Sequence, residues 1–271
     1  MKYSVLMTVY REDNPVYFES ALMSMVDQTE KPDEIVLVKD GPVTRRIQEV
    51  IDKIDIKYPN LIVQVSLPQN IGLGLALNEG IKKSKNELLA RMDSDDISLP
   101  TRCEKQVKEF EKDSNLDIIG CPVKEFSGDI TNIVGERNVP LSNDDIYRFA
   151  KKRDPFNHPT VMYKKSKVLE VSGYSNLRKN QDTDLWIKML SNGAYCKNLS
   201  EYLLYFRFDD NTYEKRKNWL NTKLLIKIRW NAFKSGFCTF SDFLIVFMGQ
   251  IGIYILPIKF QKYIYTKLLR K

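Results

Sequence analysis

The sequence predicts an α/β fold built on a mainly parallel central sheet. Three observations predict it: short apolar runs of buried-strand type, helix-like segments between them, and polar residues directly after the runs. The apolar runs cover residues 3–10, 34–38, 61–65 and 87–90. The helix-like segments, with apolar positions at three- and four-residue spacing, cover residues 15–27, 44–54 and 73–84. Strands and helices that alternate in this way indicate a parallel sheet with helical connections.

Polar side chains follow each of the four predicted strands. Thr8 and Tyr10 close the first run, Asp40 follows the second, Asn70 follows the third, and an acidic segment follows the fourth. In open α/β sheets, ligands bind outside the carboxyl ends of the strands. The sequence therefore predicts a binding site at this edge of the sheet.

The acidic segment places Asp93, Asp95 and Asp96 within four residues, just before Pro100. Carboxylates so close together repel one another unless a cation lies among their oxygens. Carboxylate oxygens are the hard ligands that Mg²⁺ or Mn²⁺ takes, commonly shared with a substrate diphosphate. The segment therefore predicts a Mn²⁺ or Mg²⁺ site, and a solvated acidic turn or a helix N-cap is the open alternative.

Seven short segments carry a further signal by their order along the chain. They are 4–10, 36–42, 70–80, 90–96, 100–102 with Gln106, 157–162 and 181–186. Together they resemble the family 2 glycosyltransferases of the GT-A fold, of the kind that builds bacterial capsule, O-antigen or exopolysaccharide. Each segment alone is a weak signal, but seven in order over the first two hundred or so residues are specific. The resemblance implies a GT-A fold, a UDP-sugar donor and inverting transfer.

The resemblance implies that Thr8, Tyr10, Asp40 and Asn70 bind the nucleotide-sugar donor. Asp40 would accept a hydrogen bond from a ring N–H of the base, or else close its strand in an Asx-turn. Tyr10 would lie against the face of the base, or else belong to the core. Asn70, with the glycines after it, would open a helix at close backbone approach to the ligand, or else only punctuate a loop.

For the acidic segment, the resemblance implies that Asp95 is the direct metal ligand and that Asp93 lies near the ribose or the metal. The cation would act as a Lewis acid on the diphosphate leaving group. Arg91 would support the same charges, or else form a surface ion pair. Asp96 is expected to cap the helix that starts near Pro100.

The catalytic carboxylate is expected in the segment 181–186. Inverting transfer needs a base beside the acceptor hydroxyl, and the resemblance implies Asp182 for this role. Gln181 stands where the family usually has Glu, which removes a charge that would raise the pKa of the base. Asp184 is the second candidate, and both could instead be capping residues of a helix. Trp186 offers a face for stacking on an acceptor sugar, or else is a core aromatic.

Other residues receive weaker predictions. His158, the only histidine, would touch the diphosphate, the acceptor or the metal, or else be structural; one histidine cannot make a zinc site. Arg207 and the run 215–217 fall where related enzymes often have a flexible basic segment that closes over the diphosphate. Arg102 and Gln106, one helical turn apart, are interpreted as structural.

The positive charge of the chain belongs to its last fifth. The formal net charge is +7, and from residue 214 onward there are 12 Lys and Arg against 2 acidic residues, leaving 30 against 33 elsewhere. A basic tail indicates nucleic acid, an acidic partner or an anionic membrane surface. Nucleic acid is disfavoured because the tail is also strongly apolar.

The apolar part of the tail, 243–256, is fourteen residues long, below the ~20 that a membrane-spanning helix needs. The segment 259–271 follows with five cations and no acid. This pattern predicts a helix lying in the headgroup layer. The open alternative is a helical subdomain packed on the catalytic core or on a partner in a homodimer.

We therefore expect a GT-A catalytic domain over 1–210, with a nucleotide-sugar half at about 1–100 and an acceptor half at about 101–210. A helical C-terminal segment, 211–271, would associate with membrane or form a dimer. No secretion signal precedes the first strand, and the four cysteines lack paired spacing, so free thiols in a reducing cytosol are expected. The expected location is the inner face of the bacterial cell membrane, attached peripherally.

The expected activity is an inverting, metal-dependent hexosyltransferase. It would move a hexose or N-acetylhexosamine of the Gal or Glc type from a UDP-sugar to a lipid-linked or growing surface-polysaccharide acceptor, forming a β-glycosidic bond. The alternatives are a nucleotidyltransferase-like sugar-nucleotide enzyme and a non-catalytic, membrane-docked partner subunit. The sequence names neither the donor sugar nor the acceptor, the linkage position or the oligomeric state.

Overall fold

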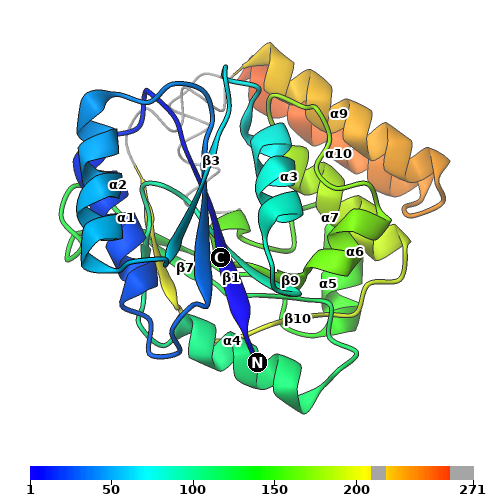
Figure 1. The fold of residues 1–271 in the computed structure, drawn as a ribbon. Coiled ribbons are helices and arrows are strands. Elements are labelled where there is room, and N and C mark those ends of the chain that lie inside the picture. The colour runs from blue at the N-terminus through cyan, green and yellow to red at the C-terminus, as the bar shows by residue number, and fades with distance from the viewer. Residues whose placement is uncertain (209–217, 257–271) are drawn as a thin grey trace.

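Figure 1 shows the computed structural model, which describes residues 1–208 and 218–256. Its main sheet has seven strands in the order β10-β6-β9-β4-β1-β2-β3. These are β1 (Tyr3–Val9), β2 (Glu34–Lys39), β3 (Ile62–Ser66), β4 (Leu88–Met92), β6 (Ile118–Gly120), β9 (Met162–Lys164) and β10 (Cys196–Asn198). A second sheet, ordered β5-β11-β7-β8, contains β5 (Ile97–Ser98), β7 (Val123–Phe126), β8 (Ile133–Arg137) and β11 (Leu204–Arg207).

The helices cover both faces of the main sheet (Figure 1). They are α1 (Pro15–Val26), α2 (Arg45–Lys57), α3 (Leu73–Lys83), α4 (Arg102–Lys112), α5 (Asn143–Ala150), the 3₁₀ helix η1 (His158–Thr160), α6 (Lys165–Glu170), α7 (Gln181–Ser191), α9 (Trp219–Lys234) and α10 (Phe240–Ile255). The strands β1, β2, β3 and β4 run parallel, while β9 is antiparallel to both β4 and β6. The expected α/β fold with a mainly parallel sheet is confirmed.

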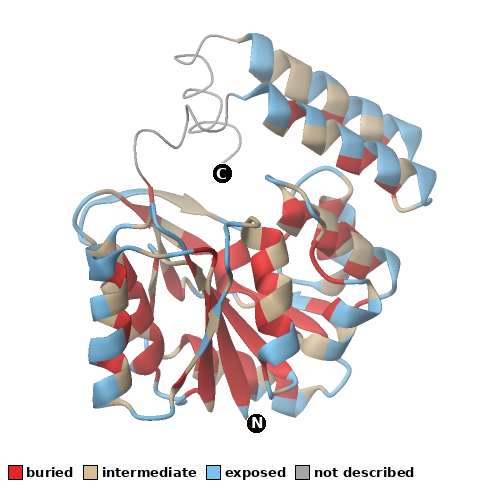
Figure 2. Cartoon of the chain, turned by 45° about the horizontal axis from the view of Figure 1, so that its top comes forward, coloured by how far each residue is buried: buried red, intermediate tan, exposed pale blue. Residues whose placement is uncertain are grey.

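The core lies on both faces of the central strands because successive side chains of a strand point to opposite sides. In β1, Val5 and Met7 pack with α1, α2 and α4, whereas Leu6 packs with α3 and α7 on the other face. Figure 2 shows these strands as the buried interior and the outer faces of the helices as exposed. This explains why the strands read as continuous apolar runs.

The turn after β4 joins the two sheets. It leads within a few residues into β5, which pairs with β11 in the second sheet through Tyr205 and Ile97. The acidic segment is therefore anchored at one end by the main sheet and at the other end by the second sheet.

The helices α9 and α10 form an antiparallel hairpin beside α7 (Figure 1). Aromatic contacts join the two helices, with ring centroids 5.1 Å apart for both Trp230–Phe243 and Trp219–Tyr254. Ile187 of α7 packs with Ile228 and Ala232 of α9. Across residues 1–208 and 218–256, no helix has the length and apolarity needed to cross a membrane. The predicted basic segment 259–271 lies outside the described residues.

All four cysteines are buried and none is in a disulfide, as the sequence predicted.

Gly80 on α3 is required by close packing against the sheet. A Cβ at this position would overlap Leu6 Cδ1 and lie 2.8 Å from Val38 Cγ2. We therefore expect Gly80→Ala to lower the free energy of unfolding by about 1–3 kcal/mol, the usual cost of overpacking. Urea denaturation measures this change.

The matched control is Gly252→Ala, also inside a helix, where an added Cβ meets no atom within 4 Å. This substitution should leave the free energy of unfolding unchanged or raise it by about 0.5–1 kcal/mol, because alanine favours a helix more than glycine does. Equal effects of the two substitutions would contradict the packing argument.

Candidate active site

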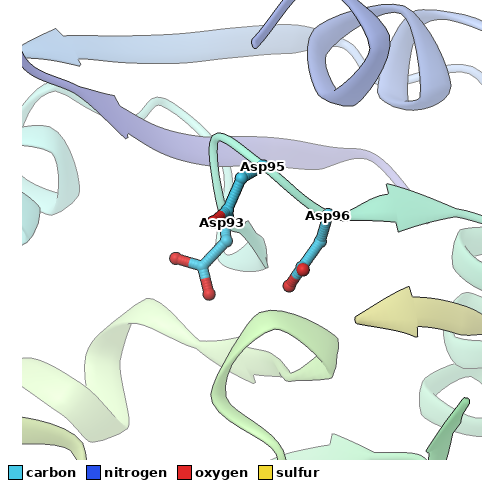
Figure 3. Close-up of side chains that lie close together, drawn as sticks. All are labelled: Asp93, Asp95 and Asp96. Atoms are coloured by element: carbon cyan, nitrogen blue, oxygen red, sulfur yellow. The ribbon is translucent and has the colours of Figure 1, made fainter. Parts of the chain in front are cut away.

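Three carboxylates gather on the turn after β4. One oxygen each of Asp93, Asp95 and Asp96 lies within 4.8 Å of the others, and Figure 3 shows Asp93 and Asp96 pointing to the same side of the turn. Asp95 is exposed and Asp93 is half-buried, but Asp96 is 0% exposed. A fully solvated acidic turn is therefore not what the structure contains.

Asp96 does not cap the next helix, which corrects the expectation from the sequence. The N-cap residue of α4 is Thr101, and it makes no side-chain cap hydrogen bond. Instead Asp96 Oδ1 accepts a hydrogen bond of 2.8 Å from the backbone N–H of Arg207. Asp96 ties the acidic turn to β11.

Arg207 holds this turn from the other side. Its Nε donates to the backbone oxygen of Asp95 at 2.9 Å, and its guanidinium lies 3.7 Å from the ring centroid of Tyr17 and 4.5 Å from that of Phe126. The side chain is buried and fixed, so the expectation that Arg207 belongs to a flexible segment over the diphosphate is wrong. The run 215–217, predicted for the same role, lies outside the described residues.

Arg91 is a buried partner of the aspartates. It is 1% exposed and forms an ion pair with Asp93, so the alternative of a surface ion pair is wrong. Its Nε and Nη1 have no hydrogen-bond partner among the described residues. A buried guanidinium with unpaired N–H groups beside a carboxylate can donate to further anionic oxygens.

Asp13 adds a fourth carboxylate that the sequence analysis missed. It follows the first predicted strand, and its Oδ2 accepts a hydrogen bond of 3.1 Å from the backbone N–H of Tyr10. Burial and the charge of Asp93 raise the pKa of Asp13 to about 6, although a hydrogen bond from Ser94 opposes the shift. Its place at a strand end was the one available signal.

This cluster fits a divalent cation. Although Asp95 is exposed as a whole residue, partial desolvation of its carboxyl group and the charges of Asp93 and Asp13 raise its pKa to about 7. Asp96 Oδ2 is buried without a hydrogen-bond partner in the described part of the chain. Closely spaced carboxylate oxygens that repel one another are typical ligands of Mg²⁺ or Mn²⁺, because the cation neutralises their charge.

On the donor side, Asp40 and Asn70 lie together at the ends of neighbouring strands. The carboxylate of Asp40 accepts hydrogen bonds from the backbone N–H groups of Ile71 at 2.7 Å and Gly72 at 3.1 Å. Asn70 Nδ2 is 3.4 Å from the backbone oxygen of Asp40. The carboxylate thus links two distant loops rather than forming the local Asx-turn, and its contact with a base stays a prediction.

Gly41 allows these two loops to meet. Its φ is +87°, and a Cβ there would lie 2.7 Å from the backbone nitrogen of Asn70. Only glycine fits both the left-handed backbone and the close approach.

Tyr10 lies at the end of β1 and is 40% exposed, so it is not a core aromatic. Its ring is accessible to a ligand, and stacking on a base stays a prediction. Thr8 lies on β1 and is half-buried at the same edge.

Asp182 lies in the first turn of α7 and is half-buried. The N-cap residue is Asn180, in the left-handed conformation, so neither Asp182 nor Asp184 is the N-cap. Burial and the charge of Asp154 raise the pKa of Asp182 to about 6, while Arg137 and Arg91 oppose the shift. Asp154 therefore supplies the negative charge that Gln181 lacks.

Asp184, the second candidate base, forms an ion pair of 2.6 Å with Lys188 one turn further along α7. This ion pair sets Asp184 apart from Asp182, and the role of Asp182 as the proton acceptor stays a prediction.

Trp186 and His158 belong to the core, which corrects two expectations. Trp186 is 1% exposed and packs edge-on against Phe156 and His158, so its ring has no free face for a sugar. His158 is buried, and its Nε2 lies 2.9 Å from the hydroxyl of Tyr174. Burial and the charge of Arg91 lower the pKa of His158, as expected for a structural histidine.

Arg102 and Gln106 are structural, as interpreted from the sequence. Arg102 donates to the backbone oxygens of Pro159 at 2.6 Å and Arg91 at 3.1 Å, and Gln106 donates to that of Thr160 at 2.7 Å. They fix η1 against the end of β4.

Comparison with known proteins gives both a family match and relatives over the full length. Residues 4–173 match the family described as glycosyl transferase family 2. The chain is 39% identical over 278 residues to an uncharacterized glycosyltransferase of Haemophilus influenzae, covering 100% of both chains. It is 34% identical over 270 residues to the UDP-Gal:alpha-D-GlcNAc-diphosphoundecaprenol beta-1,3-galactosyltransferase of Escherichia coli, covering 100% of this chain and 97% of the relative.

Among solved structures, the fold is similar to that of the mannosyltransferase PcManGT from Pyrobaculum calidifontis, determined in complex with GDP-Man and Mn²⁺. The TM-score is 0.66 at 14% identity, covering 96% of this chain and 71% of the other. At this identity the similarity shows a shared GT-A fold.

Proposed function

Because the chain belongs to glycosyl transferase family 2, we propose that it moves a hexose or N-acetylhexosamine of the Gal or Glc type from a UDP-sugar to a lipid-linked or growing surface-polysaccharide acceptor. The name of the Escherichia coli relative contains both a UDP-sugar and a diphosphate-linked lipid acceptor, which supports this choice. One observation carries the proposal: Asp93, Asp95 and Asp96 each bring an oxygen within 4.8 Å of the others at the end of β4, and the buried Arg91 pairs with Asp93. Carboxylates and a guanidinium gathered in this way suit a metal-bound diphosphate.

In the proposed reaction, Asp182 accepts the proton of the acceptor hydroxyl. That oxygen attacks the anomeric carbon from the side opposite the nucleotide, and the bond to the diphosphate breaks. Inversion of an α-linked donor gives a β-glycosidic bond. Arg91, buried behind the turn and paired with Asp93, adds positive charge to the same site and so helps to stabilise the leaving diphosphate through the field it creates.

Asp95 and Asp93, with Asp96 behind them, would hold the Mn²⁺ or Mg²⁺ ion. When bound, the cation supplies positive charge to the diphosphate as a Lewis acid. The solved mannosyltransferase with the same fold was determined with Mn²⁺. This supports metal dependence without deciding between the two ions.

We further propose that α10 attaches the protein to the inner face of the bacterial cell membrane. Its outer side carries exposed Leu244, Met248 and Ile255, of which Met248 is 62% and Ile255 72% exposed. The one charged residue of α10, Asp242, pairs with Lys152 at 3.2 Å. Figure 2 shows both helices of the hairpin largely exposed or half-buried. An apolar helix face without exposed charge, next to a basic α9, suits an anionic lipid surface.

The first test is a thermal-shift screen of sugar nucleotides with and without Mn²⁺. A UDP-hexose should raise the melting temperature only when Mn²⁺ is present, and Asp95→Ala should remove that increase because a main cation ligand is lost. Unchanged UDP affinity of Asp95→Ala in Mn²⁺ would contradict the ligand assignment. Release of UDP from a UDP-hexose by the wild type separates an enzyme from a non-catalytic partner subunit.

The second test concerns the base. Asp182→Asn should lower kcat by about 10²–10⁴-fold, the usual contribution of a general base, while leaving UDP binding intact. Asp184→Asn is the matched control and should retain most activity. If Asp182→Asn were fully active and Asp184→Asn inactive, the base would be Asp184.

The rate of the wild type should depend on pH through Asp182. A base works deprotonated, so kcat should be constant above the pKa of Asp182, which is raised to about 6 by burial and Asp154, and should fall tenfold per pH unit below it. Removing the negative charge in Asp154→Asn should shift this fall to lower pH. A fall at the same pH in both proteins would exclude Asp154 as the cause of the raised pKa.

The membrane proposal is tested by sedimentation with vesicles containing anionic phospholipid. Replacing both Leu244 and Met248 by Ser should reduce the bound fraction several-fold because apolar area is lost from the interface. The control replaces Val16 and Ile56, which are 68% and 80% exposed on α1 and α2, by Ser. If the wild type were instead a dimer that dissociated in the α10 variant, the face would be a dimer interface.

A further inference from the structure

A cavity of about 550 Å³ lies between α10 and the catalytic part of the chain. One wall is apolar and comes from α10, through Ile245, Val246, Ile253 and Tyr254. Cations from the end of β8 and from the loop after α5 line the same cavity, namely Arg137, Lys152 and Arg153. A cavity lined by both apolar and cationic side chains suits a ligand that is itself half lipid and half anion.

The charge of the lining is positive. Four lining residues are cationic, Arg137, Lys152, Arg153 and Arg229, and two are acidic, Glu125 and Asp154. Asp154 lies 3.7 Å from Arg229, and Lys152 pairs with Asp242 at 3.2 Å. Arg137, at the end of β8, and Arg153, in the loop after α5, both line this cavity. Two guanidinium groups that line one cavity offer several N–H donors to phosphate oxygens.

The cavity also adjoins the candidate base. Asn180, from which α7 starts, lines it. Two other lining residues, Asp154 and Arg137, act on the charge of Asp182. A sugar extending from the cavity toward α7 would therefore bring a hydroxyl near Asp182.

We propose that this cavity binds the acceptor by its lipid diphosphate, with Arg137 and Arg153 on the diphosphate and the α10 wall on the first units of the alkyl chain. This inference rests on the proposed function and names the part of the chain that recognises the acceptor. The outer face of α10 would lie on the membrane while its inner face receives a chain rising from that membrane. One helix thus serves both as the membrane contact and as a wall of the acceptor site.

The test measures binding of decyl diphosphate to the full chain by titration calorimetry, with UDP and Mg²⁺ present at saturation to occupy the donor site. Arg153→Gln and Arg137→Gln should each weaken binding about tenfold, the order expected for one lost charge-assisted contact. Arg45→Gln, which removes an exposed arginine on α2 that pairs with Glu49, should bind like the wild type. Unchanged affinity in both cavity variants, or no binding to the wild type, would overturn the proposal.

Inorganic diphosphate, titrated in the same way, separates the lipid from a free anion. The apolar wall predicts that decyl diphosphate binds more tightly than inorganic diphosphate. Equal affinities would mean that the cavity takes the free anion, which would overturn the lipid part of the inference.

An activity measurement distinguishes this site from the proposed function. With two acceptors carrying the same sugar, one on an alkyl diphosphate and one on a neutral alkyl group, Arg153→Gln should raise KM about tenfold for the first only. If the wild type transfers sugar but Arg153→Gln affects both acceptors equally, the site is wrong and the function stands. If no UDP-sugar supports transfer, the proposed function fails, and the binding titration still decides the site.

Discussion

Repulsion among carboxylates at the end of β4 is the constraint on which the rest of this structure depends. Asp93, Asp95 and Asp96 cannot stay so close in a low-dielectric setting without positive charge nearby. Two buried arginines from distant parts of the chain supply it, Arg91 through an ion pair and Arg207 through the backbone of the turn. They hold the cluster in place, and they leave Asp96 Oδ2 and the Nε and Nη1 groups of Arg91 without hydrogen-bond partners in the described part of the chain.

A series of buried contacts connects the acidic turn with η1 and α3. Arg102 and Gln106 fix η1 to β4, and His158 of η1 contacts Tyr174, whose backbone exchanges two hydrogen bonds with the side chain of Asn78 on α3. Through this buried chain of contacts, the positions of the acidic turn and of α7 are set by a common scaffold. Some polar residues that the sequence suggests for ligand binding, such as His158, therefore support the site instead of contacting a ligand. A rigid layer of such residues orients the groups that do touch ligands.

The hairpin α9–α10 gives the catalytic fold a second surface with its own chemistry. The outer side of α10 carries the exposed apolar residues Leu244, Met248 and Ile255, and other residues of α10 line a cavity together with the cations Arg137 and Arg153. The proposed acceptor combines a lipid with a diphosphate, so its recognition needs apolar and cationic groups together. Helix α10 contributes apolar residues to a cavity that Arg137 and Arg153 also line, and it would supply the apolar part of that recognition.

The sequence by itself determined the strands, the α/β class and the acidic turn, because these depend on local periodicity and on residues that are neighbours in the chain. It could not place Asp13, Asp154 or Arg137 beside the site, since segments far apart in sequence bring them there. Nor could it decide between function and core for Trp186, whose chemistry is the same exposed or buried. Only tertiary packing sets how much water a side chain keeps and which charges it faces, and those two quantities determine whether it reacts, binds or supports.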